Sequence, residues 1–206
     1  MKIKVCGMKY PDNIKDLFNL PIDFMGMIFY DKSPRFAGKQ DLSDLSELRR
    51  KIGRVGVFVN ADLDYIIEKT NRYGLDIIQL HGNESPEFCK RLNETMPIIK
   101  AFSIGEASDF EQTEKYEGLW GYFLFDTKTP RYGGSGQKFD WNILNAYEGD
   151  IPFFLSGGIS IDDADKIKEI QHPKFHGIDL NSKFETEPGL KDIELLKQFI
   201  KRLNDE

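Results

Sequence analysis

Residues 153–183 read FFLSGGISIDDADKIKEIQHPKFHGIDLNSK. A short apolar run is followed by a pair of glycines, then by a charged segment, and then by a second apolar run that ends before Asn181. This order predicts a strand, a crossover helix and another strand. Two strands joined in this way pair in parallel, because the chain needs a crossover element to return to the same edge of a sheet. We therefore expect one β/α/β unit here.

The same alternation extends over the whole chain. Short apolar or alternating runs, each typical of a buried strand, occur at Ile3–Cys6, Phe24–Phe29, Val55–Val59, Ile77–Leu80, Ile98–Phe102, Tyr122–Phe125, Phe153–Leu155 and Gly177–Leu180. Apolar residues at helical spacing lie between and after these runs, in the groups Ile14, Leu17 and Phe18, then Leu63, Ile66 and Ile67, and finally Ile193, Leu196, Phe199 and Ile200. Signals typical of helix starts are Pro11-Asp12, Glu84-Ser85-Pro86-Glu87 and Ser160-Ile161-Asp162-Asp163.

Eight strand–helix units predict a closed barrel. The fold class we predict is α/β, as a single-domain (β/α)8 TIM barrel of eight parallel strands over residues 1–206. Such barrels usually have about 250 residues and can be built from about 200, so the chain is at the small end. The alternative is an open doubly wound sheet. A GxGxxG motif after the first strand would favour that sheet, and the first strand ends here in Cys6-Gly7-Met8.

Composition narrows the class of protein. Hydrophobic residues make up 40% and charged residues 30%, as in ordinary globular proteins. A net charge of -6 with no dense basic block argues against a nucleic-acid partner. The longest apolar stretch, Phe24 to Tyr30, is far shorter than the roughly 18 residues of a membrane span, and the N-terminus lacks the apolar run of a secretory signal. We predict no membrane partner and a cytoplasmic location.

Cysteine and histidine spacing points away from metal. Cys6 and Cys89 show no CxxC spacing, and the three histidines do not complete a zinc ligand set with them. We therefore expect neither a metal site nor a structural disulfide.

Polar residues follow the apolar runs at the point where each predicted strand ends. They are Cys6, Ser33-Pro34-Arg35, Asn60, His81-Gly82, Asp126, Gly157-Gly158 and the stretch from Asp179 to Lys183. Catalytic and binding groups of a (β/α)8 barrel lie at the carboxyl ends of its strands and in the loops that follow. We therefore expect these residues to meet on one rim.

Phosphate is the ligand that the sequence indicates most directly. Ser156-Gly157-Gly158-Ile159 precedes a predicted helix, and glycines let backbone N–H groups approach an anion there. Asn181-Ser182-Lys183 follows the eighth strand, and loops after strands seven and eight form the common phosphate site of this fold. A simple turn is the alternative for the glycines. The loop Gly133–Gly136 is either a cover over the site or a flexible turn.

Several motifs together resemble a known family. They are Lys4-Val5-Cys6-Gly7-Met8, Lys32-Ser33-Pro34-Arg35, Val57-Phe58-Val59-Asn60, Gln79-Leu80-His81-Gly82, Phe125-Asp126-Thr127, Gly133-Gly134-Ser135-Gly136, Phe139-Asp140-Trp141 and Ser156-Gly157-Gly158-Ile159. In this order and spacing the chain resembles phosphoribosylanthranilate isomerase of tryptophan biosynthesis, over nearly its whole length.

The resemblance implies an Amadori rearrangement of a small phosphorylated sugar without a cofactor. It implies Cys6 as general base and Asp126 as general acid. Free cysteine has a pKa of about 8.5 and free aspartate one of about 3.9, so the first would have to become a thiolate and the second to hold a proton. The remaining implied contacts are Arg35 to the anthranilate carboxylate, His81 to the aromatic part, Asp179 to the sugar hydroxyls, and Gly134, Ser135, Gly157, Gly158, Asn181 and Ser182 to the phosphate.

Other interpretations stay open from the residues alone. A cysteine at a strand end is commonly a small buried residue, an aspartate before threonine a helix cap, and an arginine a surface ion pair. Lys183 stands where many family members have glycine, so it either adds charge to the phosphate site or faces solvent. The rival functions are an isomerase or epimerase of another sugar phosphate and a binding protein without turnover. A monomer and a homodimer are both compatible with the sequence.

Overall fold

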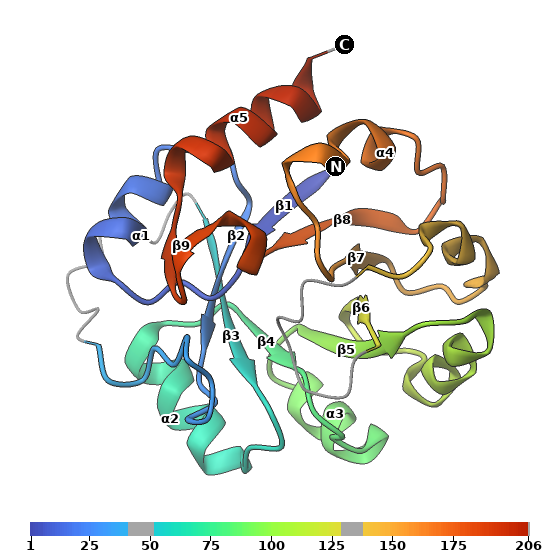
Figure 1. The fold of residues 1–206 in the computed structure, drawn as a ribbon. Coiled ribbons are helices and arrows are strands. Elements are labelled where there is room, and N and C mark those ends of the chain that lie inside the picture. Colours follow the sequence, from blue (N-terminus) through green and yellow to red (C-terminus); the bar gives the residue numbers. More distant parts are fainter. Residues whose placement is uncertain (41–51, 129–137, 206) are drawn as a thin grey trace.

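Eight parallel strands close into a barrel in the computed structural model, which describes residues 1–40, 52–128 and 138–205. The strands follow one another around the ring in chain order, and the last pairs with the first. Figure 1 shows them at the centre of the molecule with helices around them. Their bounds are β1 Lys2–Val5, β2 Phe24–Ile28, β3 Gly53–Phe58, β4 Ile77–Leu80, β5 Ile98–Ile104, β6 Gly121–Thr127, β7 Phe153–Leu155 and β8 Phe175–Leu180. This confirms the predicted fold class.

Five α-helices lie on the outside of the described barrel. They are α1 Pro11–Leu17, α2 Leu63–Tyr73, α3 Pro86–Asn93, α4 Ala164–Lys168 and α5 Ile193–Asn204. The connections after β5 and β6 carry 3-10 helices instead, at Ala107–Tyr116 and Trp141–Ala146. A further 3-10 turn, Ile161–Asp163, leads into α4. The expected crossover helices are thus partly replaced by tighter turns.

Local sequence explains where the helices begin and end. Pro11 occupies the first turn of α1, where a missing N–H costs nothing. Ser85 and Asp192 cap α3 and α5 by accepting hydrogen bonds from backbone N–H groups three residues on. Gly74 ends α2 in the left-handed conformation that glycine adopts without strain. The starts of α1 and α3 agree with the signals predicted from the sequence.

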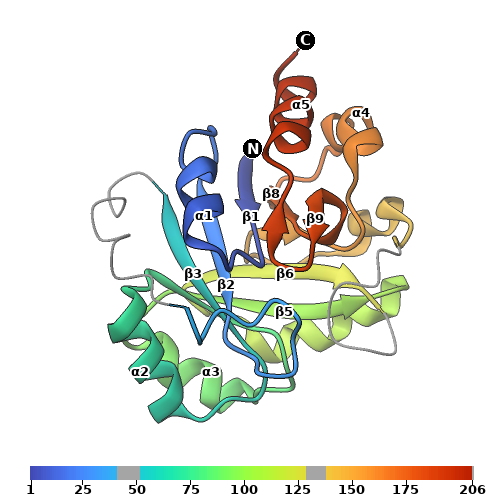
Figure 2. The same cartoon turned by 60° about the vertical axis from the view of Figure 1, so that its left-hand side comes forward.

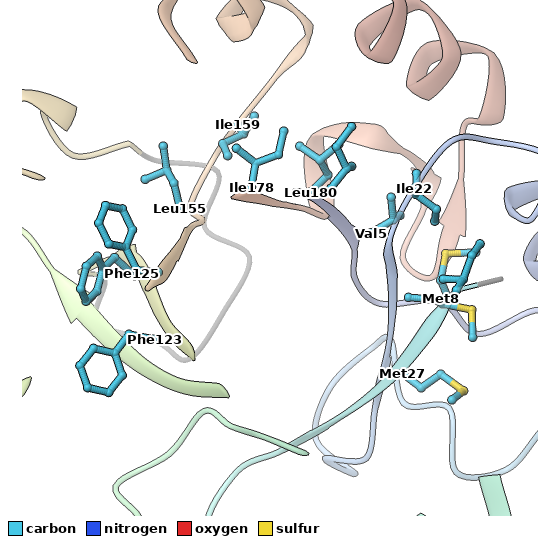
Figure 3. Close-up of a cluster of buried hydrophobic side chains, with 14 of the residues drawn as sticks. Val5, Met8, Ile22, Met27, Phe123, Phe125, Leu155, Ile159, Ile178 and Leu180 are labelled. Atoms are coloured by element: carbon cyan, nitrogen blue, oxygen red, sulfur yellow. The ribbon is translucent and has the colours of Figure 1, made fainter. Parts of the chain in front are cut away.

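The barrel has an apolar layer on each side of its strands. Between strands and helices lies the larger one, part of which Figure 3 shows with Val5, Phe123, Phe125, Leu155, Ile178 and Leu180. Inside the barrel lies a second cluster made of Val55, Ile77, Ile99, Ala101, Leu124 and Phe154. Successive side chains of a strand point to opposite faces. Residues that share a face with this inner cluster therefore also point into the barrel.

Two details differ from the expectations. Ile67, expected on the buried face of its helix, is 46% exposed. A short antiparallel hairpin, β9 Glu185–Glu187 and β10 Leu190–Lys191, follows β8 and leads to α5. In Figure 2 it lies beside the end of β8. No helix within the described ranges is long and apolar enough to span a membrane.

Candidate active site

A cavity of about 410 Å³ lies where the strands end. It is lined by Cys6, Ile28, Tyr30, Lys32, Ser33, Pro34, Arg35, Val57, Val59, Gln79, His81, Asp126, Thr127, Ser156, Gly157, Gly158, Ile159, Asp179, Asn181 and Ser182. Every described residue to which the resemblance gave a catalytic or substrate-binding role is in this set. Gly134 and Ser135, with the rest of the loop Gly133–Gly136, lie outside the described residues.

Cys6 is held in a close fit directly after β1. It is buried, and a Cβ atom built on Gly26 of the adjacent strand would lie 2.7 Å from its sulfur. Only glycine leaves room for the thiol at this point. Burial raises the pKa of Cys6, and the charges of Lys4 and Lys191 oppose this without cancelling it. Burial thus favours the neutral thiol, and two cations lie where they stabilise its ionised form.

Lys4 and Asp179 form a buried ion pair beside this thiol. The lysine Nζ atom lies 2.8 Å from Asp179 Oδ1, and both side chains are withdrawn from solvent. Burial by itself would lower the pKa of Lys4, but Asp179 and Cys6 raise it, so the lysine is a cation. Lys4 and Cys6 are two residues apart and point to the same face. The lysine therefore reaches both the thiol and the carboxylate.

Asp126 and His81 face each other across the cavity from β6 and from the end of β4. Asp126 Oδ2 lies 3.4 Å from His81 Nε2, and its Oδ1 atom accepts a hydrogen bond of 2.9 Å from the N–H of Thr127. On its other side the imidazole is bonded by Gln79, whose Nε2 atom lies 2.9 Å from His81 Nδ1. Both edges of the His81 ring are therefore engaged by neighbouring side chains.

Arg35 joins a charged network around Glu185. Its Nε and Nη2 atoms donate to the Glu185 carboxylate at 2.9 and 2.7 Å. Lys191 also pairs with that carboxylate, and donates to Asn181 Oδ1 at 2.9 Å. Burial alone would raise the pKa of Glu185, but Arg35 and Lys191 outweigh it and hold it below its ordinary value. The network fixes Arg35 through β9, an element absent from the sequence-based prediction.

The glycine loop after β7 turns sharply at Gly157 and Gly158. Both have positive φ angles, 94° and 67°, which favour glycine. A Cβ on Gly157 would lie 2.2 Å from Thr127 Oγ1 and 2.9 Å from Asp126 Oδ1. The loop thus needs glycine both for its own turn and for its approach to the end of β6. The glycines therefore form a turn that also lines the cavity, and phosphate binding by this loop stays a prediction.

Short 3-10 turns flank the expected phosphate site. The glycine loop leads into the three-residue turn Ile161–Asp163 and the five-residue α4, so this loop is not followed by a long helix whose dipole could act on the cavity. After β8, Asn181 and Ser182 line the cavity while Lys183 is exposed. Of the two possibilities for Lys183, the structure has the one that faces solvent.

Asn60 was expected on the rim and instead supports it. It has a positive φ of 50° and is exposed, outside the cavity lining. Its Oδ1 atom accepts from the N–H of Asn83, and Glu84 accepts from the N–H groups of Asn60 and Gly82. These bonds hold the loop that carries His81.

Further residues of the site were not found from the sequence. They are Lys4, Gly26, Gln79, Glu185 and Lys191. Lys4 and Gln79 had a local signal, because each lies two residues before a candidate on the same face of a strand.

Known proteins with similar sequences identify the family of this chain. A family model described as N-(5'phosphoribosyl)anthranilate (PRA) isomerase matches residues 3–202. The N-(5'-phosphoribosyl)anthranilate isomerase of Parabacteroides distasonis is 51% identical over 208 residues, which cover 98% of this chain and 93% of that protein. This chain belongs to the phosphoribosylanthranilate isomerase family.

Solved structures of phosphoribosylanthranilate isomerases have the same fold. A monomeric form of the dimeric Thermotoga maritima isomerase superposes with a TM-score of 0.84 at 29% identity, covering 98% of both chains. An isomerase in complex with reduced 1-(o-carboxyphenylamino)-1-deoxyribulose 5-phosphate superposes with a TM-score of 0.83 at 29% identity, again over 98% of both. The resemblance read from the motifs is confirmed at the level of the family.

Proposed function

We propose that this enzyme converts N-(5'-phosphoribosyl)anthranilate into 1-(2-carboxyphenylamino)-1-deoxyribulose 5-phosphate in tryptophan biosynthesis. The observation that carries the proposal is a shared cavity. A buried thiol, Cys6, and a carboxyl group, Asp126, line it together with the glycine loop after β7 and the turn after β8. Membership of the isomerase family supports the same reaction.

The reaction needs one acid and one base. In the proposed mechanism Asp126 gives a proton to the ring oxygen of the ribosyl group, the bond from that oxygen to C1 breaks, and a Schiff base forms. The Cys6 thiolate then removes the proton from C2, and the electron pair moves to give an enolamine that becomes the ketone. Lys4 and Lys191 supply the positive charge that favours a thiolate at Cys6.

The charged ends of the substrate have separate partners in this proposal. Glu185 bonds the Nε and Nη2 atoms of Arg35, so we expect the anthranilate carboxylate to use the opposite edge of the guanidinium. The phosphate would meet backbone N–H groups near Gly158 and Ser182, which line the cavity. Gly134 and Ser135 remain predicted phosphate contacts, and Asp179 a predicted contact of the sugar hydroxyls.

The experiment that tests these roles replaces the two groups and compares turnover. Cys6→Ser and Asp126→Asn are each expected to lower kcat by orders of magnitude and to change substrate affinity less, because each group acts on the transition state. Turnover is followed by fluorescence with freshly generated substrate. Cys89→Ser is the matched control, since Cys89 is a buried residue of α3 outside the cavity lining, and burial raises its pKa to about 11.

The same assay decides between the proposal and its rivals. A binding protein would show no turnover before any substitution. An isomerase of another sugar phosphate would bind phosphate but leave this substrate unchanged. Near-normal kcat in Cys6→Ser or Asp126→Asn would remove the proposed mechanism.

The proposed mechanism is compatible with a monomer. A homodimer, as in the Thermotoga maritima isomerase, is compatible with it. A cytoplasmic location and the absence of a cofactor stay predictions from the sequence.

A further inference from the structure

Three side chains form a line from the wall of the barrel to the proposed acid. Gln79 is buried on β4, and its amide Nε2 atom lies 2.9 Å from His81 Nδ1. His81 Nε2 lies 3.4 Å from Asp126 Oδ2. Gln79 and His81 are two residues apart, so they point to the same face and both line the cavity. The mechanism described above gives Gln79 no part.

The amide determines where the imidazole carries its proton. An amide nitrogen only donates hydrogen bonds, so Nδ1 of His81 has to accept from Gln79. A neutral imidazole that accepts at Nδ1 carries its hydrogen on Nε2, and that hydrogen points toward Asp126. Protonation of Nδ1 would bring two donors together at 2.9 Å. Gln79 therefore opposes the imidazolium form.

Two carboxylates lie near His81. Asp126 on β6 lies beside its ring and Asp179 on β8 interacts with it electrostatically, and of these two only Asp179 is paired with a lysine, Lys4, among the described residues. A positive imidazolium next to Asp126 would favour the carboxylate, and a carboxylate has no proton to give. A neutral N–H group instead bonds weakly to the acid and more strongly to the carboxylate that appears when the proton leaves. It therefore stabilises the transition state more than the ground state.

We propose that Gln79 is a positioning residue that keeps His81 neutral with its hydrogen on Nε2, so that His81 supports Asp126 as it gives up its proton. The proposal rests on the function proposed above and extends it to how the acid is maintained. The separation of 3.4 Å between His81 and Asp126 fits such a role, since catalytic hydrogen bonds are often long without substrate and shorten during the reaction.

The opposite orientation of the amide makes a different prediction. With its oxygen toward His81, Gln79 would require a hydrogen on Nδ1 and leave Nε2 as an acceptor. In the present orientation Gln79 Oε1 is buried and has no hydrogen-bond partner among the described residues. The reverse would leave buried N–H donors there instead, and orphaned donors are rarer in proteins than under-satisfied carbonyls. This difference favours the orientation described here.

The first test measures the tautomer directly, without any assay of activity. Nitrogen and carbon NMR shifts of the ring distinguish a hydrogen on Nε2, a hydrogen on Nδ1 and the imidazolium. Full-length protein labelled at its three histidines is used, and His81 is assigned by the loss of its signals in His81→Gln. The expected result at neutral pH is a neutral ring with the hydrogen on Nε2. A hydrogen on Nδ1, or an imidazolium, overturns the proposal.

The second test changes the amide. Gln79→Met keeps a similar volume without a donor, and is expected to move the His81 shifts toward a mixture of tautomers and lower kcat on the order of 10-fold. Gln79→Glu can accept from Nδ1–H, so it is expected to give the imidazolium and lower kcat on the order of 10²-fold. KM should change little in both. Unchanged shifts of His172 and His176 show that the fold is intact.

A conservative replacement of His81 separates this role from packing. His81→Gln places an N–H group near the position of Nε2 and cannot become a cation, so it should retain more turnover than His81→Leu. Equal kcat in these two variants, or unchanged kcat and His81 shifts in Gln79→Met, contradicts the proposal. If Cys6→Ser or Asp126→Asn stays active while the Nε2 tautomer is observed, the proposed mechanism fails instead, and the two failures are distinguishable.

Discussion

Replacing Gly26 by alanine moves the proposed base without removing it. The new Cβ atom would lie 2.7 Å from the Cys6 sulfur, where ordinary contacts begin at 3.4 Å. The thiol therefore has to move by about 0.7 Å. A misplacement of about 1 Å can cost on the order of 10²-fold in rate. We expect Gly26→Ala to lower kcat roughly 10- to 100-fold, which corresponds to about 1.4 to 2.7 kcal/mol.

The assay for this variant is the fluorescence progress curve, which gives kcat and KM, together with urea unfolding. Alanine removes some of the freedom of the unfolded chain, so the free energy of unfolding should stay within about 1 kcal/mol of the original. Gly105→Ala is the control, because Gly105 is exposed and its nearest atoms belong to the flexible Lys128 side chain. A folded Gly26→Ala protein with undiminished kcat would refute the claim that the thiol acts from its observed position.

Three other predictions concern charge. Lys4→Met leaves Asp179 buried and unpaired, so the free energy of unfolding measured in urea should fall by roughly 3–5 kcal/mol. The double change Lys4→Met/Asp179→Leu should largely restore it. A fall of less than about 1 kcal/mol contradicts this prediction. Glu185→Gln releases the arginine it holds and should raise KM on the order of 10-fold with less effect on kcat, whereas the exposed Glu187→Gln on the same hairpin should change neither. Burial, together with the charges of Lys2 and the N-terminus, lowers the pKa of His176 below its ordinary value of 6.5. The neutral imidazole therefore contributes fully to stability above pH 6.5, and this contribution is lost as the pH falls further. His176→Phe should therefore weaken the pH dependence of the urea midpoint between pH 7.5 and 5.5, and an unchanged dependence would rule this out.

The strands and the position of the site were predictable because both depend on local pattern. Runs such as Ile77–Leu80 carry their periodicity in a few residues, and parallel strands bring their carboxyl ends together whatever the sequence between them. The polar residues after those runs therefore had to lie together at the carboxyl end of the barrel. The 3-10 helices after β5 and β6 were not predicted, because their apolar spacing resembles that of an α-helix until packing selects the tighter turn.

Which residues contact the candidate residues depends on tertiary packing, and a local sequence pattern does not determine that packing. β9 and β10 contain three and two residues, which is too few to show a periodic pattern. They nevertheless bring Glu185 and Lys191 into the charged network of Arg35. Gly26 and Gln79 could have been recognised in part from the sequence. Both interrupt apolar strands on the face that points into the barrel, where a missing side chain or a buried amide needs a reason.

Pairing of the first strand with the last has a consequence for synthesis. The backbone N–H of Cys6 donates to the carbonyl of Leu180, which is made about 170 residues after it, and Lys191 follows later still. At about 5–20 residues per second, the thiol spends on the order of ten seconds or more without the strand that completes its surroundings. A nascent chain that stops before β8 therefore lacks the strand beside Cys6, and the surroundings of the thiol form only after β8 and Lys191 have been made.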